Sequence, residues 1–427
     1  MVSDALNPPR GMRDLTGVDA WLHEYLVNTF KKTAVSTGFE PIVTPTVEYF
    51  KLFEAKSGEE VKNSMYVFQD KAGRLLALRP EVTASVVRAY LKGLRSEPKP
   101  LKLYYVAQCF RYEEPQHARY REFWQAGLEV IGDPDVNADL SAAFTASVFL
   151  DEIGVEHEYV VGSVAVHRGL MKGLGIPDEA QDHVLHLIDK GLIDKALEEA
   201  SKHSSKGDAG LLKELLNTPL EKLEGFINDS KELLGGDYER VLKEHERLLE
   251  FTEALRSLGY RVEYSPSLVR GLAYYTGLIF EYKTKTLGVS IGGGGRYDGL
   301  TMVYGGVFEH STGLALGLDR IALVLQGVKT PGSAGGVAVI LSSKVPVSHG
   351  YRVAGALVKA GFKATVYRSP GFSKPLGHAA RKGYSRAVII GEKEFNEGSA
   401  TVKNLETGAQ STIKLQELLD DPVKHLA

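Results

Sequence analysis

An arginine and two adjacent tyrosines stand in a mostly apolar stretch, residues 268–277. Arginine is rarely buried without a partner, so Arg270 in this setting predicts an anion facing it. Neighbouring residues of an extended segment point to opposite faces, so we expect one of Tyr274 and Tyr275 to line a pocket while the other packs. The stretch therefore predicts a site for a ligand that carries both an anion and a polar ring.

A second concentration of charge lies in residues 108–123, where arginines and glutamates stand between phenylalanines: Phe110, Arg111, Glu113, Glu114, Arg119, Arg121 and Phe123. Guanidinium groups match phosphate oxygens in pairs, aromatic faces stack on a base, and carboxylates accept from an exocyclic amine. A charged, solvated hairpin loop has a similar composition. We expect the Phe-Arg-x-Glu pattern of residues 110–113 to lie inside a strand, which favours a nucleoside triphosphate site.

Four consecutive glycines occupy residues 292–295. No Lys-Ser or Lys-Thr pair follows them, so they do not form a phosphate-binding loop of the Gly-rich plus lysine type. Two interpretations remain open. The run is either a tight turn or, beside Arg296, Tyr297 and Asp298, a segment whose backbone passes close to a bound ligand.

The sequence predicts no protein-bound metal. Cys109 is the single cysteine, which excludes a cysteine-based zinc site and an internal disulfide framework. Among the twelve histidines, no pair combines metal-ligand spacing with nearby carboxylates. Cys109 itself is expected to be a packed thiol.

Positive charge is concentrated near the C-terminus, although the whole chain has a net charge of -3. Residues 335–427 contain thirteen Lys or Arg and seven Asp or Glu, a net charge of +6. Aromatic residues are interleaved with the basic ones. A solvated basic face and a nucleic-acid-binding surface both explain this pattern.

The elements that must position these residues fall into three blocks. Residues 19–37 have the apolar spacing of an amphipathic helix, and residues 65–78 predict a hairpin around a turn at residues 70–73. Strands are expected at residues 101–110 and 123–131. The N-terminal block is thus mostly antiparallel sheet with helices alongside, and its hairpin carries the charged residues described above.

A helical block and a small α/β block follow. Residues 178–258 are rich in Leu, Glu and Lys at helical spacing, which indicates an insertion between two sheet-forming segments. Residues 327–336 have the composition of a linker. Beyond them, strands alternate with helices, a pattern typical of an α/β domain with a largely parallel sheet.

Three segments resemble the sequence motifs of class II aminoacyl-tRNA synthetases. Gly38, Phe39 and Pro45 resemble motif 1, and residues 110–123 resemble motif 2. Residues 313–320, which end in Arg320, resemble motif 3. Within that class, further segments are similar to histidyl-tRNA synthetases in particular: residues 78–83, Gln125 with Glu129, residues 268–277 and residues 294–300. The resemblance covers nearly the whole chain.

The resemblance implies an α+β fold. Residues 1–165 would form the first part of an antiparallel-sheet catalytic domain with motifs 1 and 2, and residues 166–260 a helical insertion. Residues 261–328 would complete the catalytic domain with the tyrosine segment and motif 3. Residues 335–427 would form an anticodon-binding α/β domain.

The same resemblance implies roles for individual residues. Arg111 and Arg270 would be the catalytic pair at the α-phosphate of ATP. Histidine would be bound by Glu81, Thr83, Arg111, Gln125, Glu129, Arg270, Tyr274 and Tyr275. ATP would be bound by Arg111, Glu113, Arg119, Phe123 and Arg320, and tRNA by Gln116, Arg381 and Lys382.

The implied reaction joins L-histidine to tRNA(His) through a histidyl-adenylate, with ATP as a substrate that Mg²⁺ accompanies. The implied partners are tRNA(His), histidine and ATP, in a cytoplasmic homodimer. No apolar run approaches the length of a membrane span.

Two other functions remain possible from the sequence. One is a catalytically silent relative, the regulatory subunit of ATP phosphoribosyltransferase, which generally lacks the anticodon-binding domain. The other is a synthetase-like RNA-binding module without the chemistry. The basic C-terminal block and the retained Arg111, Arg270 and Arg320 favour the ligase.

One position departs from the pattern of the resembled family. The usual form of the tyrosine segment has Asp where this chain has Ala273. We expect activity to survive, because Glu81, Glu129 and Asp298 belong to the same set of motifs.

Overall fold

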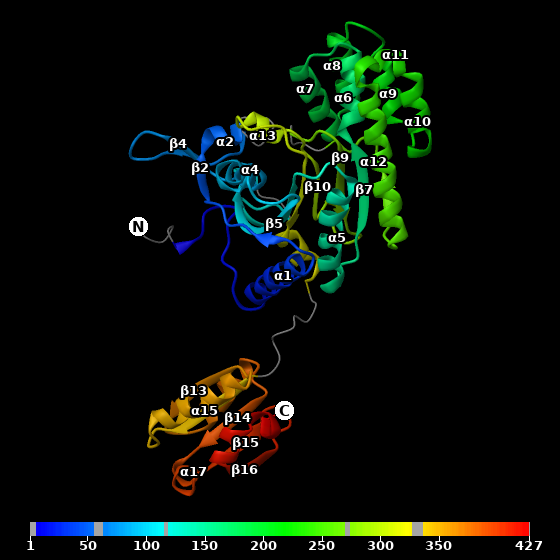
Figure 1. Cartoon of the computed structure of the whole chain (residues 1–427). Helices are drawn as coiled ribbons and strands as arrows, with labels where there is room; N and C mark the ends of the chain where they lie inside the picture. The colour runs from blue at the N-terminus through cyan, green and yellow to red at the C-terminus, as the bar shows by residue number, and fades with distance from the viewer. Residues whose placement is uncertain (1–5, 55–62, 115–117, 270–273, 327–335, 427) are drawn as a thin grey trace. The chain divides into compact units, whose positions relative to one another are not determined.

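The computed structural model describes residues 6–54, 63–114, 118–269, 274–326 and 336–426 (Figure 1). The chain divides into two compact units, Met1–Val328 and Lys329–Ala427. Arg270, Ala273, Gln116 and most of the predicted linker lie outside the described residues.

The first unit is built on an eight-stranded sheet. Its strands, in spatial order, are β1 (Glu40–Pro41), β5 (Leu101–Phe110), β6 (Glu122–Ile131), β11 (Ser311–Gly317), β10 (Gly292–Arg296), β9 (Leu278–Lys283), β7 (Glu158–Ser163) and β8 (Val262–Tyr264). The six central strands pair antiparallel, and only the two edge strands, β1 and β8, pair parallel with their neighbours. The predicted antiparallel architecture is confirmed.

Strand β5 shows how the sheet is covered on both faces. Tyr104 belongs to the main core with helices α1 (Gly17–Ser36) and α5 (Val136–Glu152), which lie side by side in Figure 1. The alternate residues Leu103, Tyr105 and Cys109 pack instead with α4 (Thr83–Ala89). Alternation along a strand sends successive side chains to opposite faces.

The predicted N-terminal elements are present. Helix α1 ends where Gly38 adopts a positive φ of 83°, which is accessible to glycine at little cost. Strand β5 pairs with β6 from Leu101 opposite Ile131 to Phe110 opposite Glu122. Strand β5 ends at Phe110, so the expectation that residues 110–113 lie inside a strand is wrong beyond the first of them. The nitrogen of Arg111 still donates to the carbonyl of Arg121 at 2.9 Å, which fixes the strand exit.

A small second sheet contains the predicted hairpin. Its order is β2 (Val47–Tyr49), β4 (Leu75–Leu78) and β3 (Val67–Gln69), with α2 (Phe50–Glu54) beside it. A carboxylate oxygen of Asp70 accepts from the nitrogens of Ala72 and Arg74, both at 2.9 Å. This local hydrogen bonding stabilises the turn between β3 and β4.

The helical block is α6 (Val164–Gly173), α7 (Asp178–Asp189), α8 (Ile193–His203), α9 (Gly210–Leu216), α10 (Leu220–Asp229), α11 (Lys231–Leu234) and α12 (Tyr238–Ser257). Its apolar residues join the main core through α12, which packs on α5, β7 and β9. The remaining helical segments of the unit are η2 (Tyr90–Leu94), η3 (Gly235–Asp237), α13 (Leu300–Val303) and α14 (Leu318–Val324). No helix in the described ranges is long and apolar enough to span a membrane.

The second unit is a five-stranded sheet in the order β13 (Ala364–Ser369), β12 (Val337–Ser342), β14 (Arg386–Ile390), β15 (Ser399–Asn404) and β16 (Gln410–Lys414). Strands β12, β13 and β14 pair parallel, but β15 and β16 pair antiparallel, so the prediction of a largely parallel sheet holds for the first three strands only. Its helices are α15 (Val347–Lys359), α16 (Ser373–Arg381), α17 (Glu392–Glu397), α18 (Leu415–Asp420) and α19 (Pro422–Leu426). Strand β12, which lies between β13 and β14, is buried along its whole length.

Candidate active site

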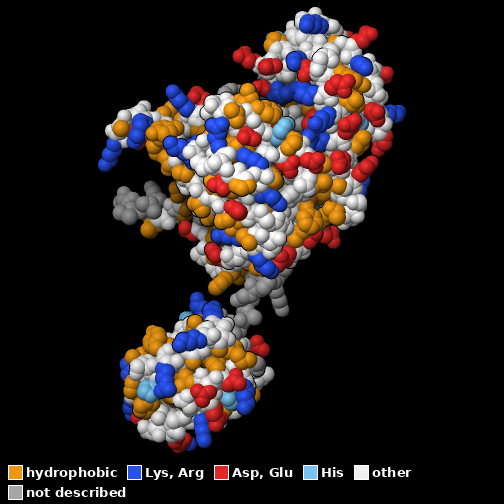
Figure 2. Space-filling view, in the orientation of Figure 1, with side chains coloured by type: hydrophobic (Ala, Val, Ile, Leu, Met, Phe, Trp, Pro, Cys, Tyr) orange, Lys and Arg blue, Asp and Glu red, His pale blue; other side chains and the backbone are white. Residues whose placement is uncertain are grey.

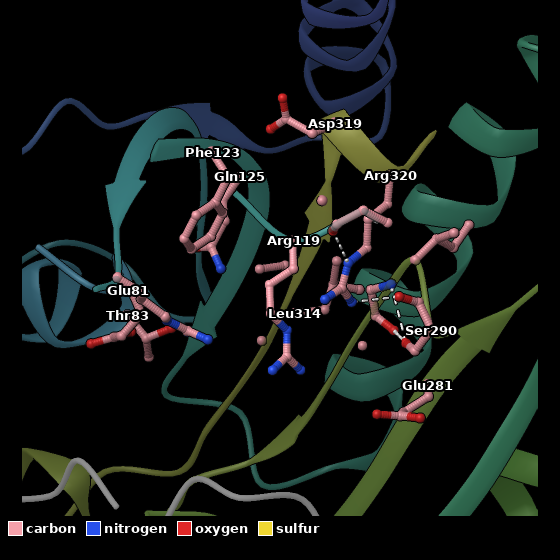
Figure 3. A pocket seen from close by; sticks show the side chains of 18 of the residues that line it. Glu81, Thr83, Arg119, Phe123, Gln125, Glu281, Ser290, Leu314, Asp319 and Arg320 are labelled. Atoms are coloured by element: carbon pink, nitrogen blue, oxygen red, sulfur yellow. Dashed lines mark hydrogen bonds between the residues drawn. The ribbon is translucent and has the colours of Figure 1, made fainter. Parts of the chain in front are cut away.

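A pocket on the large sheet gathers most of the residues that the sequence singled out. Its walls include ten of them: Glu81, Thr83, Arg111, Glu113, Arg119, Phe123, Gln125, Tyr274, Tyr275 and Arg320. Figure 3 shows Glu81 and Thr83 on one side, Ser290 and Glu281 on the other, and Arg119 between them. Residues more than 200 positions apart in the sequence thus face one cavity of about 210 Å³.

The glycine run forms strand β10, so its interpretation as a tight turn is wrong. A Cβ atom at Gly294 would lie 2.0 Å from the carbonyl oxygen of Gly313 on β11. Gly292 and Gly293 line the pocket. Absence of side chains therefore serves two purposes, because it lets neighbouring strands approach and leaves room over the sheet for a ligand.

Three arginines, Arg111, Arg119 and Arg320, line the pocket, and each has a partner within the chain. Arg111 Nε donates to the carbonyl of Pro80 at 3.0 Å. Arg119 Nε lies 3.3 Å from a carboxylate oxygen of Glu113, and Arg320 donates to the carbonyl of Ser290 at 2.7 Å. The guanidinium of Arg111 also lies 5.4 Å from the centre of the Phe123 ring. These contacts hold several positive charges at one place before any anion binds.

The acidic side of the pocket is deeply buried. Glu81 is 5% exposed and accepts from the nitrogen of Ala84 at 3.0 Å. Burial raises the pKa of Glu81 above its ordinary value, although the hydrogen bond from Ala84 opposes the shift. A carboxylate whose charge is costly to bury is stabilised by a cation, so this wall suits an ammonium group.

Glu129 lies behind the pocket wall rather than among the lining residues. The hydroxyl of Thr83 donates to one of its oxygens at 2.7 Å, and the hydroxyl of Tyr297 donates to the other. Burial raises the pKa of Glu129 to about 8, against the effect of the two hydroxyl groups. Glu129 therefore acts on a ligand indirectly, through Thr83 and Tyr297. Direct contact with a ligand requires one of these hydroxyl groups to give up its hydrogen bond to the Glu129 carboxylate.

The two tyrosines depart from the alternation expected from the sequence. Tyr274 and Tyr275 precede β9, outside any strand, and both line the pocket. Their ring centres lie 5.0 Å apart, and both side chains are buried. The expectation that one of them would pack away from the pocket is wrong, because the strand geometry behind it is absent there.

Asp298 is another residue whose setting differs from the expectation. It pairs with Arg296 at 3.5 Å and with His310 at 3.0 Å, and its carboxylate accepts from the nitrogen of Ser311 at 2.8 Å. It is not among the pocket residues. Of the three carboxylates expected to compensate for Ala273, only Glu81 lines the pocket directly.

Several pocket residues were not assigned from the sequence. Tyr105 and Tyr297 lie beside Glu129, whereas Glu281 and Ser290 lie at the opposite wall. Tyr105 belongs to an apolar strand pattern that gives no sign of a ligand. Glu281 lies on strand β9 and faces the pocket. The alternation of side chains along β9 would have predicted this only once the register of the strand was known.

An N-terminal arginine supports the pocket from outside. Arg13 pairs with Asp319, and its guanidinium carbon lies 3.8 Å from the centre of the Tyr120 ring. Asp319 also accepts from the nitrogen of Trp124 on β6 at 2.7 Å. Asp319 and Tyr120 both line the pocket, so Arg13 links the segments that resemble motifs 2 and 3.

The remaining predicted residues lie elsewhere. Arg381 and Lys382 are exposed at the end of α16 in the second unit. Gln116 and Arg270 lie outside the described residues. Among the described residues, no group of three or more His, Cys, Asp or Glu side chains is arranged to hold a metal ion.

This architecture matches that of a solved synthetase. An apo histidyl-tRNA synthetase from S. aureus has 25% sequence identity to this chain and a TM-score of 0.73, with 97% of this chain and 98% of that chain covered. The antiparallel sheet and its pocket of arginines, aromatic rings and carboxylates thus define a class II aminoacyl-tRNA synthetase unit.

Sequence comparison narrows the class. The profile described as Histidyl-tRNA synthetase matches residues 11–321, and the profile described as Anticodon binding domain matches residues 337–423. A histidine–tRNA ligase of Saccharolobus solfataricus is 40% identical over 96% of this chain and 97% of its own length. One from Sulfolobus acidocaldarius is 38% identical over 98% of this chain and 99% of its own length. The chain belongs to the histidyl-tRNA synthetase family.

Proposed function

We propose that this chain ligates L-histidine to tRNA(His) in two steps, through a histidyl-adenylate made from histidine and ATP. The observation that carries the proposal is the convergence of Arg111, Arg119 and Arg320 with Phe123 and a buried acidic wall in one pocket. A silent regulatory relative has no need to retain this set. Kinship with histidine–tRNA ligases over nearly the full chain also favours the enzyme.

The first step needs no protein nucleophile. The histidine carboxylate attacks the α-phosphorus of ATP, its oxygen forms the new bond, and pyrophosphate leaves. Negative charge develops on the phosphate oxygens, so fixed cations accelerate the step by positioning and charge stabilisation. We assign Arg111 to the α-phosphate together with Arg270, and Arg119 and Arg320 to the terminal phosphates.

Recognition of the base and of the amino acid uses the two sides of the pocket. Phe123 is assigned to the face of adenine and Glu113 to its edge. Glu81, Thr83 and Gln125 are assigned to the histidine ammonium. Tyr275 is assigned to the imidazole together with Glu129. An amino acid without an imidazole would leave these buried polar groups unpaired. Apolar amino acids of similar size are therefore rejected.

Mg²⁺ is proposed to accompany ATP. This ion prefers oxygen ligands and usually binds through one or two carboxylates plus substrate phosphates. The carboxylate of Glu281 and the hydroxyl of Ser290, which donates to the carbonyl of Gly292 at 2.6 Å, would offer such oxygens on the wall opposite Glu81. The ion would neutralise charge on the leaving pyrophosphate.

We also propose a homodimer in the cytoplasm, where the tRNA substrate is used in translation. The small sheet and its neighbouring turn expose apolar side chains, which Figure 2 shows gathered over this part of the surface: Val43, Val47, Tyr49, Val67, Phe68 and Leu75. Exposed apolar patches mark association sites. The segment resembling motif 1 leads into this sheet, so the patch is proposed as the dimer surface.

The division of labour follows the proposed domains. The catalytic part, residues 1–165 and 261–328, would form the adenylate, and residues 335–427 would bind the anticodon region. For the helical insertion, residues 166–260, we propose no chemical role.

Histidine-dependent exchange of pyrophosphate into ATP tests the proposal. Purified full chain is expected to catalyse exchange with histidine and not with the other amino acids. A protein that binds ATP and histidine but gives no exchange would favour the regulatory alternative. The homodimer is tested separately by light scattering, with Phe68→Lys expected to yield monomers.

A further inference from the structure

A buried cluster of charged side chains joins the last helix of the helical block to the catalytic sheet. We call it the buried charge network. It contains Glu244 and Arg247 of α12, Asp139 of α5, Arg296 at the end of β10, and Asp298 just after that strand. None of these side chains lines the pocket, and none is more than 18% exposed. Two arginines and three carboxylates have a net charge of -1, so each buried charge depends on the others for stabilisation.

Arg247 connects helix α12 with helix α5, which lie against each other (Figure 1). Its Nε donates to a carboxylate oxygen of Glu244 at 3.2 Å. One terminal nitrogen donates to Asp139 at 3.5 Å, and the other donates to the carbonyl of Pro134 at 2.7 Å. Each of the three guanidinium nitrogens thus has an acceptor. A side chain without the planar fork could not reproduce this arrangement.

Asp139 is shared between Arg247 and a second arginine, which belongs to the sheet. The oxygen Oδ2 of Asp139, to which Arg247 donates, also accepts from Nε of Arg296 at 2.8 Å. Burial raises the pKa of Asp139 to about 6, and the two arginines oppose that shift. A fully buried carboxylate is costly unless it is paired, so Asp139 ties the position of α12 to the end of strand β10.

The end of β10 in turn holds the segment 274–277, which carries the two pocket tyrosines. The carbonyl of Arg296 accepts from the nitrogen of Thr276 at 2.8 Å. The hydroxyl of Thr276 accepts from the nitrogen of Asp298 at 2.9 Å. Tyr297, which lies between these two charged residues in the sequence, lines the pocket itself. The same few residues therefore fix two parts of one pocket wall.

Gly277 brings the helical block directly against this segment. A Cβ atom at Gly277 would lie 2.4 Å from Oε2 of Glu244, so the main chain after the tyrosines packs on that carboxylate. The other oxygen of Glu244 is the one that Arg247 binds. The carbonyl of Gly277 also accepts from the nitrogen of Val164, the first residue of α6, at 2.9 Å. The first and the last helix of the helical block thus both contact the segment.

We propose that Arg247 and Glu244 are positioning residues for histidine, because they hold from outside the pocket the wall that carries Tyr274 and Tyr275. The inference rests on the proposed function, in which this wall receives the imidazole. The helical block then supplies position rather than chemistry. The arginines assigned to ATP are held instead by backbone carbonyls and by Glu113, so binding of ATP should depend little on α12.

Three single variants of the full chain and one double variant test the proposal. Arg247→Met leaves one arginine with three carboxylates, whereas Glu244→Met leaves two charges of each sign and is expected to fold. The control is Val241→Ala, since Val241 is also fully buried on α12 but packs against α6 at Gly169. Unfolding temperatures measure the loss of stability. Histidine-dependent pyrophosphate exchange is then followed without tRNA, at varied histidine and at varied ATP.

Each methionine variant should raise the KM for histidine roughly tenfold and leave the KM for ATP within about twofold. The double variant should show less than the product of the single effects, because both side chains act through one contact. Val241→Ala should lower the unfolding temperature and change neither KM, since it leaves the network intact.

A purely structural role predicts a different result. A fall in kcat with both KM values unchanged, equal rises in the two KM values, or the same response in Val241→Ala would overturn the proposal. If Arg247→Met does not fold, Glu244→Met decides alone, and an unchanged KM for histidine in that variant would overturn the proposal. Absence of exchange in the unmodified chain would instead refute the proposed function, so the two failures are distinguishable.

Discussion

The cations of the catalytic pocket and two lysines of the second unit, Lys359 and Lys382, have opposite surroundings. Arg111 and Arg320 donate to backbone carbonyls, and Arg119 faces Glu113, so these guanidiniums are fixed before a substrate arrives. Lys359 and Lys382 are exposed and have no such ion pair among the described residues. A reacting phosphate needs charge at a defined place, because reorganisation would add to the barrier. A long polyanion, by contrast, is bound equally well by side chains that adjust their positions to it.

The largest effect is expected where a fixed pocket charge is removed. Arg111→Ala should lower the rate of histidine-dependent exchange by roughly 10²–10³, the usual scale for loss of a transition-state charge contact. Arg270→Ala should have an effect of the same size. Arg111→Lys should restore little, since an ammonium cannot reproduce the planar fork. If either alanine variant lost tRNA charging but kept normal exchange, that arginine would not act on the reacting phosphate. The distinction between the two regions would then fail.

The pH dependence of stability tests the free-energy cost of burying the Glu129 carboxylate behind the pocket wall. The pKa of Glu129 is raised by burial to about 8, above the ordinary 4.5, so the folded protein holds this proton more tightly than the unfolded chain. Its stabilising contribution is present below pH 4.5 and is lost as pH rises through about 8. Relative to Glu129→Gln, the wild type should lose about 3 kcal/mol of unfolding free energy between pH 4.5 and pH 7.

Denaturant titrations of both proteins across that pH range measure this difference. Glu48→Gln provides a control, because Glu48 is also buried but is paired with Arg88 at 2.7 Å. Parallel pH dependence of wild type and Glu129→Gln would show that Glu129 is charged in the folded protein at neutral pH.

Arg13 should have a smaller effect, because it acts through other residues. Asp319 and Tyr120 both line the pocket. Arg13→Met removes the ion pair with Asp319 and the contact with Tyr120. The KM for ATP in the exchange reaction should rise by about fivefold, the scale of one partly exposed charge contact. Arg10→Met is the matched control, since its pair with Glu114 is largely exposed. A change in kcat alone, or equal effects of both variants, would argue against a positioning role for Arg13.

Cys109 should give the smallest effect. Burial raises the pKa of its thiol to about 12, so almost no thiolate is present at neutral pH. Cys109→Ser should keep exchange activity within about twofold, because a hydroxyl can replace the thiol contact to Gln125 at 3.2 Å. Iodoacetamide should leave native protein unmodified, as mass spectrometry would show. Rapid alkylation with loss of activity would mean that the strand β5 opens near the pocket.

Local sequence patterns predicted the elements better than the details of the pocket. The alternation in residues 101–110 and 123–131, the turn at Asp70 and the helical spacing of residues 19–37 depend on nearby residues. The parallel strands of the second unit were predicted for the same reason. Ten of the site residues implied by the resemblance reached one pocket, because the motifs fix where each strand end lies.

The errors arose where long-range packing decides. The glycine run became a strand because β9 and β11 approach it closely on both sides, which no local signal reveals. Tyr274 and Tyr275 both face the pocket because the chain there leaves strand geometry. Arg13 precedes the first helix in a segment without periodicity, and only the fold brings it beside Asp319, which is 306 positions away.

One measurement tests the central claim most directly. The full chain is mixed with histidine, Mg²⁺ and ATP labelled at the α-phosphate, first without tRNA and then with tRNA(His). The account predicts that labelled histidyl-adenylate accumulates on the enzyme and that tRNA converts it to AMP and histidyl-tRNA. Binding of ATP and histidine without any labelled adenylate would contradict it.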